Sequence, residues 1–202
     1  MIPLYDIEQG TDAWFAAKAG RPGASSFDKI LTTKGEPSKQ RQDYLYELAG
    51  ERIIGRQEPG YSNYAMERGI TLESEGRALF ELLHDVELKQ VGVVYRDESR
   101  RVLCSPDGLL EDAGFEQKNP MLKTHVKYLL AGTLPTDYYQ QVHGSMWVCG
   151  FDSWYFMSNY PGMPPLILKV HCDEKWLVKL DSVMKEFLDE LDYVHAEILK
   201  KS

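Results

Sequence analysis

The segment CSPDGLLEDAGFEQKNP, residues 104–120, decides the fold and contains the side chains best suited to chemistry. A proline and a glycine flank Asp107 and interrupt one predicted strand, and a second strand begins after the polar turn EDAG. Successive side chains of a strand point to opposite faces, so Glu116 and Lys118 share one face. If the two strands pair through this short turn, Asp107 lies beside Glu116 at one end of the sheet.

Two neighbouring carboxylates repel each other unless a proton or a cation lies between them. Hard oxygen ligands of this kind suit Mg²⁺ or Mn²⁺, and the backbone carbonyl of Gln117 could supply another ligand. A divalent ion with Lys118 beside it performs the operations that phosphodiester hydrolysis requires. The alternative is an ordinary SPDG turn followed by a solvated Glu116–Lys118 ion pair, because this spacing alone often occurs by chance.

The flanking sequence alternates between helical and strand patterns. Helices are predicted at 12–19, from Ser25 or Ser26, and at 39–54, 63–84, 122–131, 136–149 and from Asp173 onward, and strands at 87–96, 101–110, 114–118, 153–159 and 166–171. This order predicts an α/β fold with a central, mixed, twisted sheet of about five strands and helices on both sides. The last helix carries apolar residues along its whole length, which predicts a contact with the sheet or, alternatively, with another subunit.

Composition narrows the class of protein. The 202 residues are 43% hydrophobic, and no linker divides them, so we expect one domain spanning residues 1–202. No apolar run is long enough to span a bilayer and no signal peptide is evident, which predicts a cytoplasmic protein with no membrane partner. A net charge of −8 argues against a nonspecific nucleic-acid coat, but it does not exclude a DNA enzyme whose acidic residues hold metal.

Several stretches together resemble the PD-(D/E)xK nuclease superfamily, and more narrowly the phage lambda-type alkaline exonucleases of viral recombination. The matching stretches are EQGTDAW, ASS, GITLESEGRALFE, VVYRDESRRVLCSPDG, GFEQKNP, QVHGSMW and SWYFMSNY. Their order and spacing cover most of the chain up to the last helix. The resemblance implies a restriction-endonuclease-like core and a protein encoded by a phage or prophage, acting in a bacterial host.

The resemblance also implies catalytic roles. Asp107, Glu116 and the Gln117 carbonyl would bind Mg²⁺, for which Mn²⁺ can substitute, and Lys118 would position or activate the attacking water. Glu73 matches the helical acid of the family, which reaches a metal directly or through water. Independently, Glu73 lies within an apolar helical stripe, where an unpaired carboxylate is costly. The alternative for Glu73 is a surface ion pair with the residue four positions later.

A pocket for the 5′-phosphate of the digested strand is a further implication. Candidate substrate-binding residues are Lys18, Arg21, Ser25, Ser26, Ser105, Gln141 and His143. The two neighbouring serines lie where a helix begins, a position that attracts anions and that is also explained by simple N-capping. Relatives tend to carry arginine where this chain has Lys18, so either Lys18 or Arg21 is the phosphate ligand. His143 is expected at the edge of the site or, alternatively, as a hydrogen-bonded structural histidine.

The activity implied is Mg²⁺-dependent 5′-to-3′ digestion of one strand of linear double-stranded DNA from a 5′-phosphorylated end, leaving a 3′ single strand for recombination. A ring-shaped homotrimer enclosing DNA and a single-strand annealing protein are the implied partners. Enclosure would substitute for the missing positive charge. The alternatives are a structure- or site-selective endonuclease of the same superfamily and an inactive scaffold that binds DNA ends.

Overall fold

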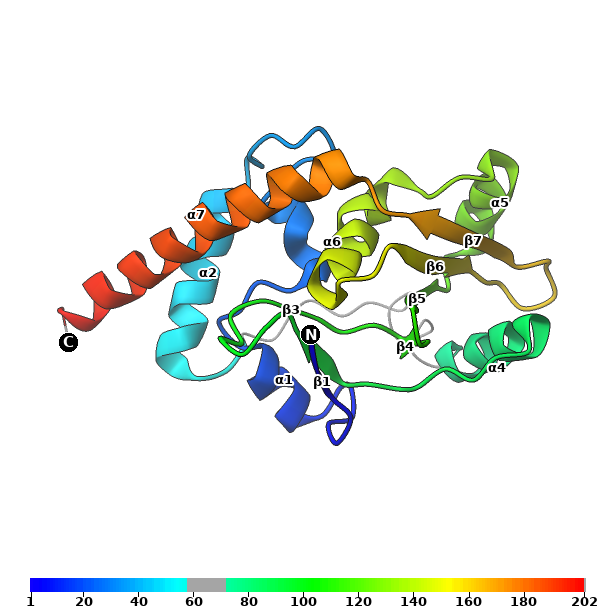
Figure 1. Cartoon of the computed structure of the whole chain (residues 1–202), viewed down its shortest axis with the longest axis horizontal. Coiled ribbons are helices and arrows are strands. Elements are labelled where there is room, and N and C mark those ends of the chain that lie inside the picture. Colours follow the sequence, from blue (N-terminus) through cyan, green and yellow to red (C-terminus); the bar gives the residue numbers. More distant parts are fainter. Residues whose placement is uncertain (58–71, 202) are drawn as a thin grey trace.

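Two small β-sheets and six α-helices form the part of the protein that the computed structural model describes, residues 1–57 and 72–201 (Figure 1). The first sheet has the order β1-β2-β3 and is antiparallel. The second has the order β4-β5-β6-β7, in which β5 and β6 run parallel and the other pairs run antiparallel. The strands are β1 (Ile2–Leu4), β2 (Val93–Tyr95), β3 (Leu103–Cys104), β4 (Gly108–Leu109), β5 (Ala113–Lys118), β6 (Ser153–Ser158) and β7 (Leu166–His171).

The α/β class and a mixed sheet are confirmed, but the expectation of one central sheet of about five strands is wrong. The predicted strand 101–110 is divided into β3 and β4, because Pro106 has no N–H for a strand ladder. The break places β3 in the first sheet and β4 in the second. Two backbone hydrogen bonds of 2.9 Å between Lys89 and Leu109 join the residues before β2 to β4.

The helices follow the sequence patterns closely. They are α1 (Asp12–Lys18), α2 (Arg41–Ile54), α4 (Glu73–His84), α5 (Leu122–Ala131), α6 (Tyr139–Cys149) and α7 (Glu174–Leu199), with 3₁₀ segments at Ala24–Lys29 and Thr136–Tyr138. The expected start of a helix at Ser25 or Ser26 is wrong, because the 3₁₀ segment begins at Ala24 and follows Gly23 without a side-chain cap. Residues 63–71 of the predicted helix 63–84 lie outside the described residues.

Helices cover both faces of the second sheet (Figure 1). On one face, Phe80 of α4 packs against Phe115 of β5, with ring centroids 4.5 Å apart. On the other face, α6 packs against β5 and β6. Because β5 alternates its side chains between these faces, Phe115 and Gln117 point toward α4, whereas Glu116 and Lys118 point toward α6.

Helix α7 packs against α2 and α6 (Figure 1), which differs from the expected contact with the sheet. Asp173 caps its N-terminus by accepting a hydrogen bond of 3.0 Å from the Trp176 N–H, as its position before the helix predicts. Phe187 of α7 stacks on Tyr44 of α2. Within the described ranges, no helix combines the length and apolarity that crossing a membrane requires.

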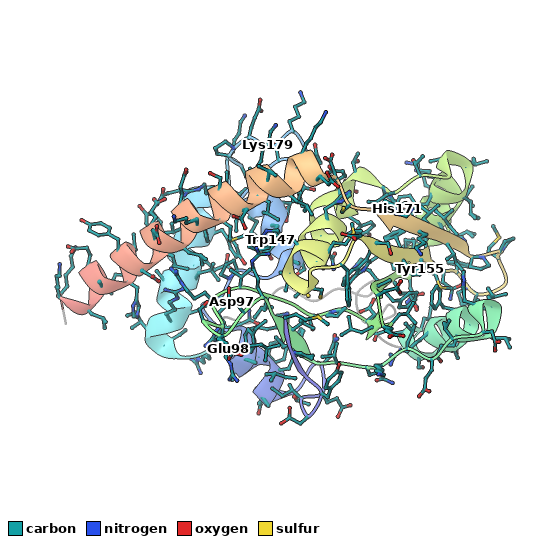
Figure 2. The ribbon with its side chains drawn as sticks, viewed as in Figure 1. Asp97, Glu98, Trp147, Tyr155, His171 and Lys179 are labelled. Carbon is teal, nitrogen blue, oxygen red and sulfur yellow. The ribbon has the colours of Figure 1, made fainter. Side chains whose placement is uncertain are left out.

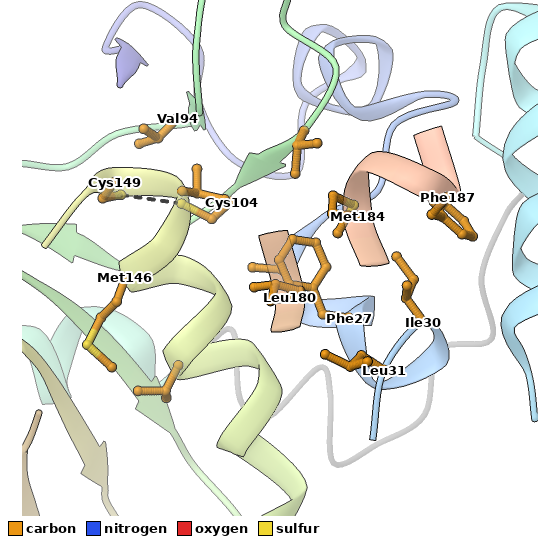
Figure 3. Packing of buried hydrophobic residues seen from close by; sticks show 14 of the residues in the cluster. Phe27, Ile30, Leu31, Val94, Cys104, Met146, Cys149, Leu180, Met184 and Phe187 are labelled. Atoms are coloured by element: carbon orange, nitrogen blue, oxygen red, sulfur yellow. Dashed lines mark hydrogen bonds between the residues drawn. The ribbon is translucent and has the colours of Figure 1, made fainter. Parts of the chain in front are cut away.

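The main core joins the 3₁₀ segment Ala24–Lys29 to α6 and α7. Figure 3 shows Phe27, Met146 and Leu180 from these elements within one buried cluster. The thiols of Cys104 and Cys149 meet in the same cluster, with their sulfurs 3.6 Å apart. Outside this core, Lys179 on α7 and His171 on β7 are exposed (Figure 2). The core therefore fixes the N-terminal segments against α6, beside the second sheet.

Gly114→Ala should destabilise the protein by about 1–3 kcal/mol, because overpacking forces neighbours from their places. An added Cβ at Gly114 would lie 2.2 Å from the Trp154 ring on the adjacent strand. Gly50→Ala is the matched control, since no atom lies within 4 Å of its Cβ position on α2. That change should stabilise by about 0.5–1 kcal/mol. Urea denaturation measures both effects, and equal effects of the two changes would contradict this packing.

Candidate active site

The hairpin of β4 and β5 brings Asp107 beside Glu116, as the sequence predicts. Gly108 pairs with Phe115, and the Asp107 N–H donates a hydrogen bond of 3.1 Å to the Phe115 carbonyl. The Gln117 N–H in turn donates to Asp107 Oδ2 at 2.6 Å. These bonds hold the Asp107 carboxylate against the strand that carries Glu116.

Glu116 is the centre of a polar cluster on the face of β5 that α6 covers. Its Oε1 accepts hydrogen bonds from Lys118 Nζ at 2.5 Å and from Gln141 Nε2 at 2.6 Å. Its Oε2 is buried and has no hydrogen-bond partner among the described residues. A buried carboxylate oxygen without a partner is costly, so this atom is a candidate ligand for a cation.

The charges of this cluster are strongly coupled. Burial raises the pKa of Asp107 well above its usual range, the nearby Glu116 and Glu73 add to the rise, and Lys118 opposes it. Burial alone would lower the pKa of Lys118, but the neighbouring Glu116 and Asp107 outweigh it and raise that pKa. Lys118 is therefore a stable ammonium ion, and a further cation near Asp107 would favour the ionised form of that carboxyl.

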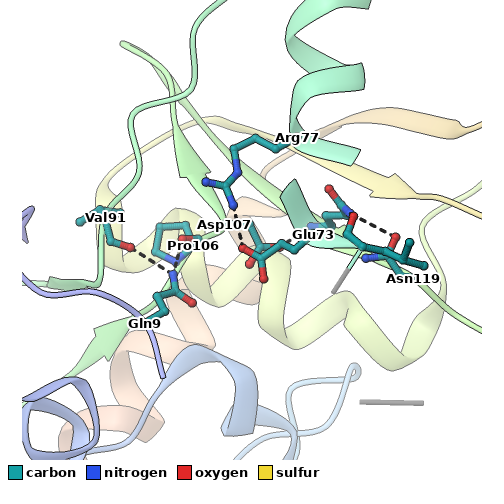
Figure 4. Close-up of polar contacts among 9 residues, drawn as sticks. Gln9, Glu73, Arg77, Val91, Pro106, Asp107 and Asn119 are labelled. Atoms are coloured by element: carbon teal, nitrogen blue, oxygen red, sulfur yellow. Dashed lines mark hydrogen bonds and ion pairs between the residues drawn. The ribbon is translucent and has the colours of Figure 1, made fainter. Parts of the chain in front are cut away.

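Glu73 contributes from the first turn of α4. Its carboxylate pairs with Arg77 at 3.0 Å, so the alternative of an i,i+4 ion pair describes the geometry (Figure 4). The carboxylate is nonetheless close enough to Asp107 to raise the pKa of that carboxyl. The Gln117 side chain lies on the α4 face, where its Nε2 donates to Asn119 Oδ1 at 3.1 Å.

The donor set fits Mg²⁺ or Mn²⁺ in part. Within the described portion of the chain, no three acidic, histidine or cysteine side chains lie close enough together to hold a metal ion. The carboxylates of Asp107 and Glu116, the latter through its unpartnered Oε2, remain as hard oxygen donors. Mg²⁺ commonly keeps several waters and binds through one or two carboxylates, so this pair suits it without a complete protein cage.

A small pocket of about 160 Å³ lies between α1, the 3₁₀ segment and the turn before Asp107. Four of the predicted substrate-binding residues line it, namely Lys18, Ser25, Ser105 and Gln141. Trp14 Nε1 donates to Ser105 Oγ at 2.8 Å, and the Lys18 ammonium lies 3.5 Å from the centre of the Trp14 ring. Burial lowers the pKa of Lys18 to about 8, although Glu51 opposes this shift. Because Gln141 also contacts Glu116, the pocket adjoins the carboxylates.

Three predicted substrate-binding residues do not line this pocket. Arg21 directs its guanidinium to the backbone carbonyls of residues 17, 19 and 100. Ser26 forms a side-chain hydrogen bond with Tyr44. His143 is buried, and its Nδ1 accepts a hydrogen bond of 3.2 Å from the Asp173 N–H, which matches the structural alternative for this histidine.

One positioning residue is missed by the sequence analysis. Gln9 Nε2 donates to the Pro106 carbonyl at 2.9 Å and to the Val91 carbonyl at 3.1 Å, and thereby ties the N-terminal segment to the turn before Asp107 (Figure 4). Its only signal in the sequence is membership of the stretch EQGTDAW. No hydrophobic period identifies a lone glutamine that bonds to backbone carbonyls.

The chain is similar to a family of viral recombinases and to solved exonuclease structures. Residues 13–152 match the family described as the YqaJ-like viral recombinase domain. The alkaline exonuclease LHK-Exo from Laribacter hongkongensis is 27% identical, with a TM-score of 0.85 over 95% of this chain and 97% of that one. Its complex with dAMP matches at 28% identity with the same TM-score and coverage.

Two further proteins are similar to this chain. An uncharacterised protein named ExoD from Escherichia coli (strain K12) is 33% identical over 78 residues, which cover 36% of this chain and 90% of that protein. A phage-related exonuclease from Haemophilus somnus 129PT is 15% identical, with a TM-score of 0.66 over 88% of this chain and 96% of that one. At that identity, the last match supports the fold alone.

Mn²⁺ should raise the melting temperature of the wild-type protein, because a ligand that binds only the folded state stabilises it, by about 2.7 kcal/mol at a hundredfold excess over Kd. Asp107→Asn and Glu116→Gln should lose this gain. Asp112→Asn, which removes an exposed carboxylate from the same hairpin turn, should keep it. The gain should shrink as the pH falls, because the raised pKa of Asp107 lets protons compete with the ion. Equal Mn²⁺ gains in all four proteins would contradict the assignment.

Proposed function

The chain belongs to the YqaJ-like viral recombinase family, and from this premise we propose that it is a Mg²⁺-dependent 5′-to-3′ exonuclease. It degrades one strand of linear double-stranded DNA from a 5′-phosphorylated end and leaves a 3′ single strand. Homology to an alkaline exonuclease along nearly the whole chain supports hydrolysis of DNA. The dAMP complex of that relative supports recognition of a nucleotide.

One observation carries the proposal: the half-buried Asp107 and the buried Glu116, whose Oε2 is unpartnered among the described residues, adjoin a lysine-containing pocket. A cation between the carboxylates would relieve the repulsion that raises the pKa of Asp107. A phosphate in the neighbouring pocket would compensate the Lys18 charge. A metal ion and the 5′-phosphate of a nucleic-acid end would together balance the carboxylates and the Lys18 ammonium.

The proposed metal ligands are Asp107, Glu116 and the Gln117 carbonyl, with Glu73 acting through water. When bound, the divalent ion polarises the scissile phosphate and lowers the pKa of the attacking water. Lys118 stays protonated because its pKa is raised, so it orients the water and stabilises negative charge rather than accepting a proton. Gln141 fixes the Glu116 carboxylate through its 2.6 Å hydrogen bond.

In this proposal, the small pocket sets the direction of digestion. Lys18, Ser25 and Ser105 receive the terminal 5′-phosphate, so the scissile bond is measured from a strand end. Of the two candidate cations, Lys18 is favoured, because it lines this pocket and Arg21 does not. A lysine presents a point charge, unlike the bidentate fork of an arginine.

Double-stranded DNA ends are thus the proposed substrate, and a homotrimeric ring is the proposed assembly. The acidic chain, with a net charge of −8, gains little from counterion release on DNA. Enclosing the duplex would retain it without many phosphate contacts. A single-strand annealing protein is the proposed partner for the exposed 3′ strand.

Digestion of matched DNA substrates tests the function. A linear duplex with 5′-phosphates should be degraded with Mg²⁺, a covalently closed circle should stay intact, and chelation should stop the reaction. Asp107→Asn should lower kcat at least about 100-fold, a size typical of lost charge stabilisation, whereas Asp112→Asn should act like the wild type. Cutting of the circle would favour the endonuclease alternative, and end binding without nucleotide release would favour the scaffold.

The preference for 5′-phosphate over 5′-hydroxyl ends should fall as the pH rises above 8. Lys18 has a pKa of about 8, so it is charged below that pH and becomes neutral above it. The ratio of kcat/KM for the two ends should decline by about tenfold per pH unit above 8. In Lys18→Arg the ratio should stay level, because arginine remains protonated throughout. Parallel profiles for both proteins would exclude Lys18 as the phosphate ligand.

A further inference from the structure

A second, larger pocket of about 600 Å³ lies on the opposite side of α1 from the Lys18 pocket. Trp14 and Lys18 of α1 line the smaller pocket, whereas Ala16 and the following Ala19 line the larger one. Its other walls come from α2, α7 and residues 99–101 between β2 and β3. The volume falls within the range of about 300–1,000 Å³ that small ligands occupy in proteins.

Arginines dominate the polar lining of this pocket. Asp192 of α7 accepts a hydrogen bond of 2.7 Å from Arg52 Nη1 through Oδ1. Its Oδ2 accepts another of 2.5 Å from Arg101 Nη2. A single carboxylate is thus shared by two guanidinium groups. This trio carries one net positive charge, which Asp97, outside the pocket lining, offsets in part, because Arg101 is near enough to lower the pKa of that carboxyl.

Two further arginines add charge without an anionic partner. Arg21 donates to three backbone carbonyls at 2.9–3.2 Å through Nε and Nη1, which leaves Nη2 and the positive charge of the group for a ligand. Arg100 is exposed, and its guanidinium lies 5.6 Å from the centre of the Tyr95 ring. Within residues 1–57 and 72–201, no carboxylate forms an ion pair with either.

The remaining acidic residue of the lining, Glu51, does not balance the positive charge of these arginines. Glu51 is buried, and its Oε2 accepts the Gly20 N–H at 2.8 Å, while Arg52 Nε donates to the Gly20 carbonyl at 2.8 Å. Asp97 and Glu98, on the same connection between β2 and β3 (Figure 2), do not line the pocket. Four guanidinium groups therefore face two carboxylates, a local excess of positive charge in a chain of net charge −8.

We propose that this pocket is a second phosphate site, separate from the catalytic cluster, which binds the phosphate group of a nucleotide. Guanidinium groups suit phosphate because their planar donors match two oxygens at once. Arg21 and Arg52 are held in place before any ligand arrives, which limits the entropy lost on binding. Anion binding follows from the pocket itself, whereas the choice of nucleotide phosphate rests on the proposed function. Its source is a released mononucleotide or the backbone of a DNA strand.

NMR of the arginine Nε–Hε groups tests the site in the full-length protein without divalent ions. Titration with inorganic phosphate should shift the Arg21 and Arg100 signals saturably, whereas chloride at the same ionic strength should not. The shifts should persist in Lys18→Gln, which separates this pocket from the smaller one. Titrations with dAMP and with an oligothymidylate lacking terminal phosphates then distinguish a mononucleotide from a strand, and tight binding of either supports the site.

Arg100→Gln should weaken phosphate binding about tenfold, as expected for a lost charged hydrogen bond. The fold should persist, because Arg100 is exposed and only its backbone carbonyl is bonded to Arg21. Lys175→Gln removes the same charge from an exposed position of α7 and should leave the affinity unchanged.

Equal affinities of wild type and Arg100→Gln, identical shifts with chloride, or loss of the shifts in Lys18→Gln would each overturn the proposal. Phosphate binding at this pocket by a protein that digests no DNA would refute the proposed function alone.

Discussion

The site depends on confining two carboxylates within one buried hairpin. In water such a pair would separate, but the Gln117 N–H holds Asp107 and the Lys118 and Gln141 side chains hold Glu116. Burial, and then the nearby Glu116, still raise the pKa of Asp107, so ionising both carboxylates in this hairpin is costly. A hard cation bound to the pair would offset that cost. Such preorganisation costs stability in the free protein and lowers the cost of binding charge later.

The break at Pro106 makes this arrangement possible. A continuous strand through residues 101–110 would keep Ser105 and Asp107 within one ladder. The division into β3 and β4 places the Ser105 side chain toward Trp14 and Lys18, while Asp107 joins the hairpin. Gln9 fixes the break from outside by bonding to the Pro106 carbonyl. The small pocket and the carboxylates are thus neighbours because the chain leaves the first sheet at this proline.

Local patterns predict local structure here. The two-residue period places Glu116 and Lys118 on one face, and the short EDAG turn predicts their approach to Asp107, since both effects act within a few residues. The helices from α5 to α7 follow equally from periodicity and caps. The separation into two sheets, the strand β1 and the contact of α7 with α2 depend on pairing between distant segments, which periodicity does not specify. Likewise, only the packed chain distinguishes Lys18 from Arg21, because both are basic residues of the same short segment.

The two halves of the site differ in how far apart their parts lie along the chain. The bond between Gln117 and Asp107 spans 10 residues, whereas that between Trp14 and Ser105 spans 91. A chain in which α1 has detached from the rest would keep the hairpin but lose one wall of the small pocket. Under the proposed function, discrimination between an end and an interior bond would therefore require the complete tertiary structure, whereas the two carboxylates proposed to bind a divalent ion lie within one contiguous peptide.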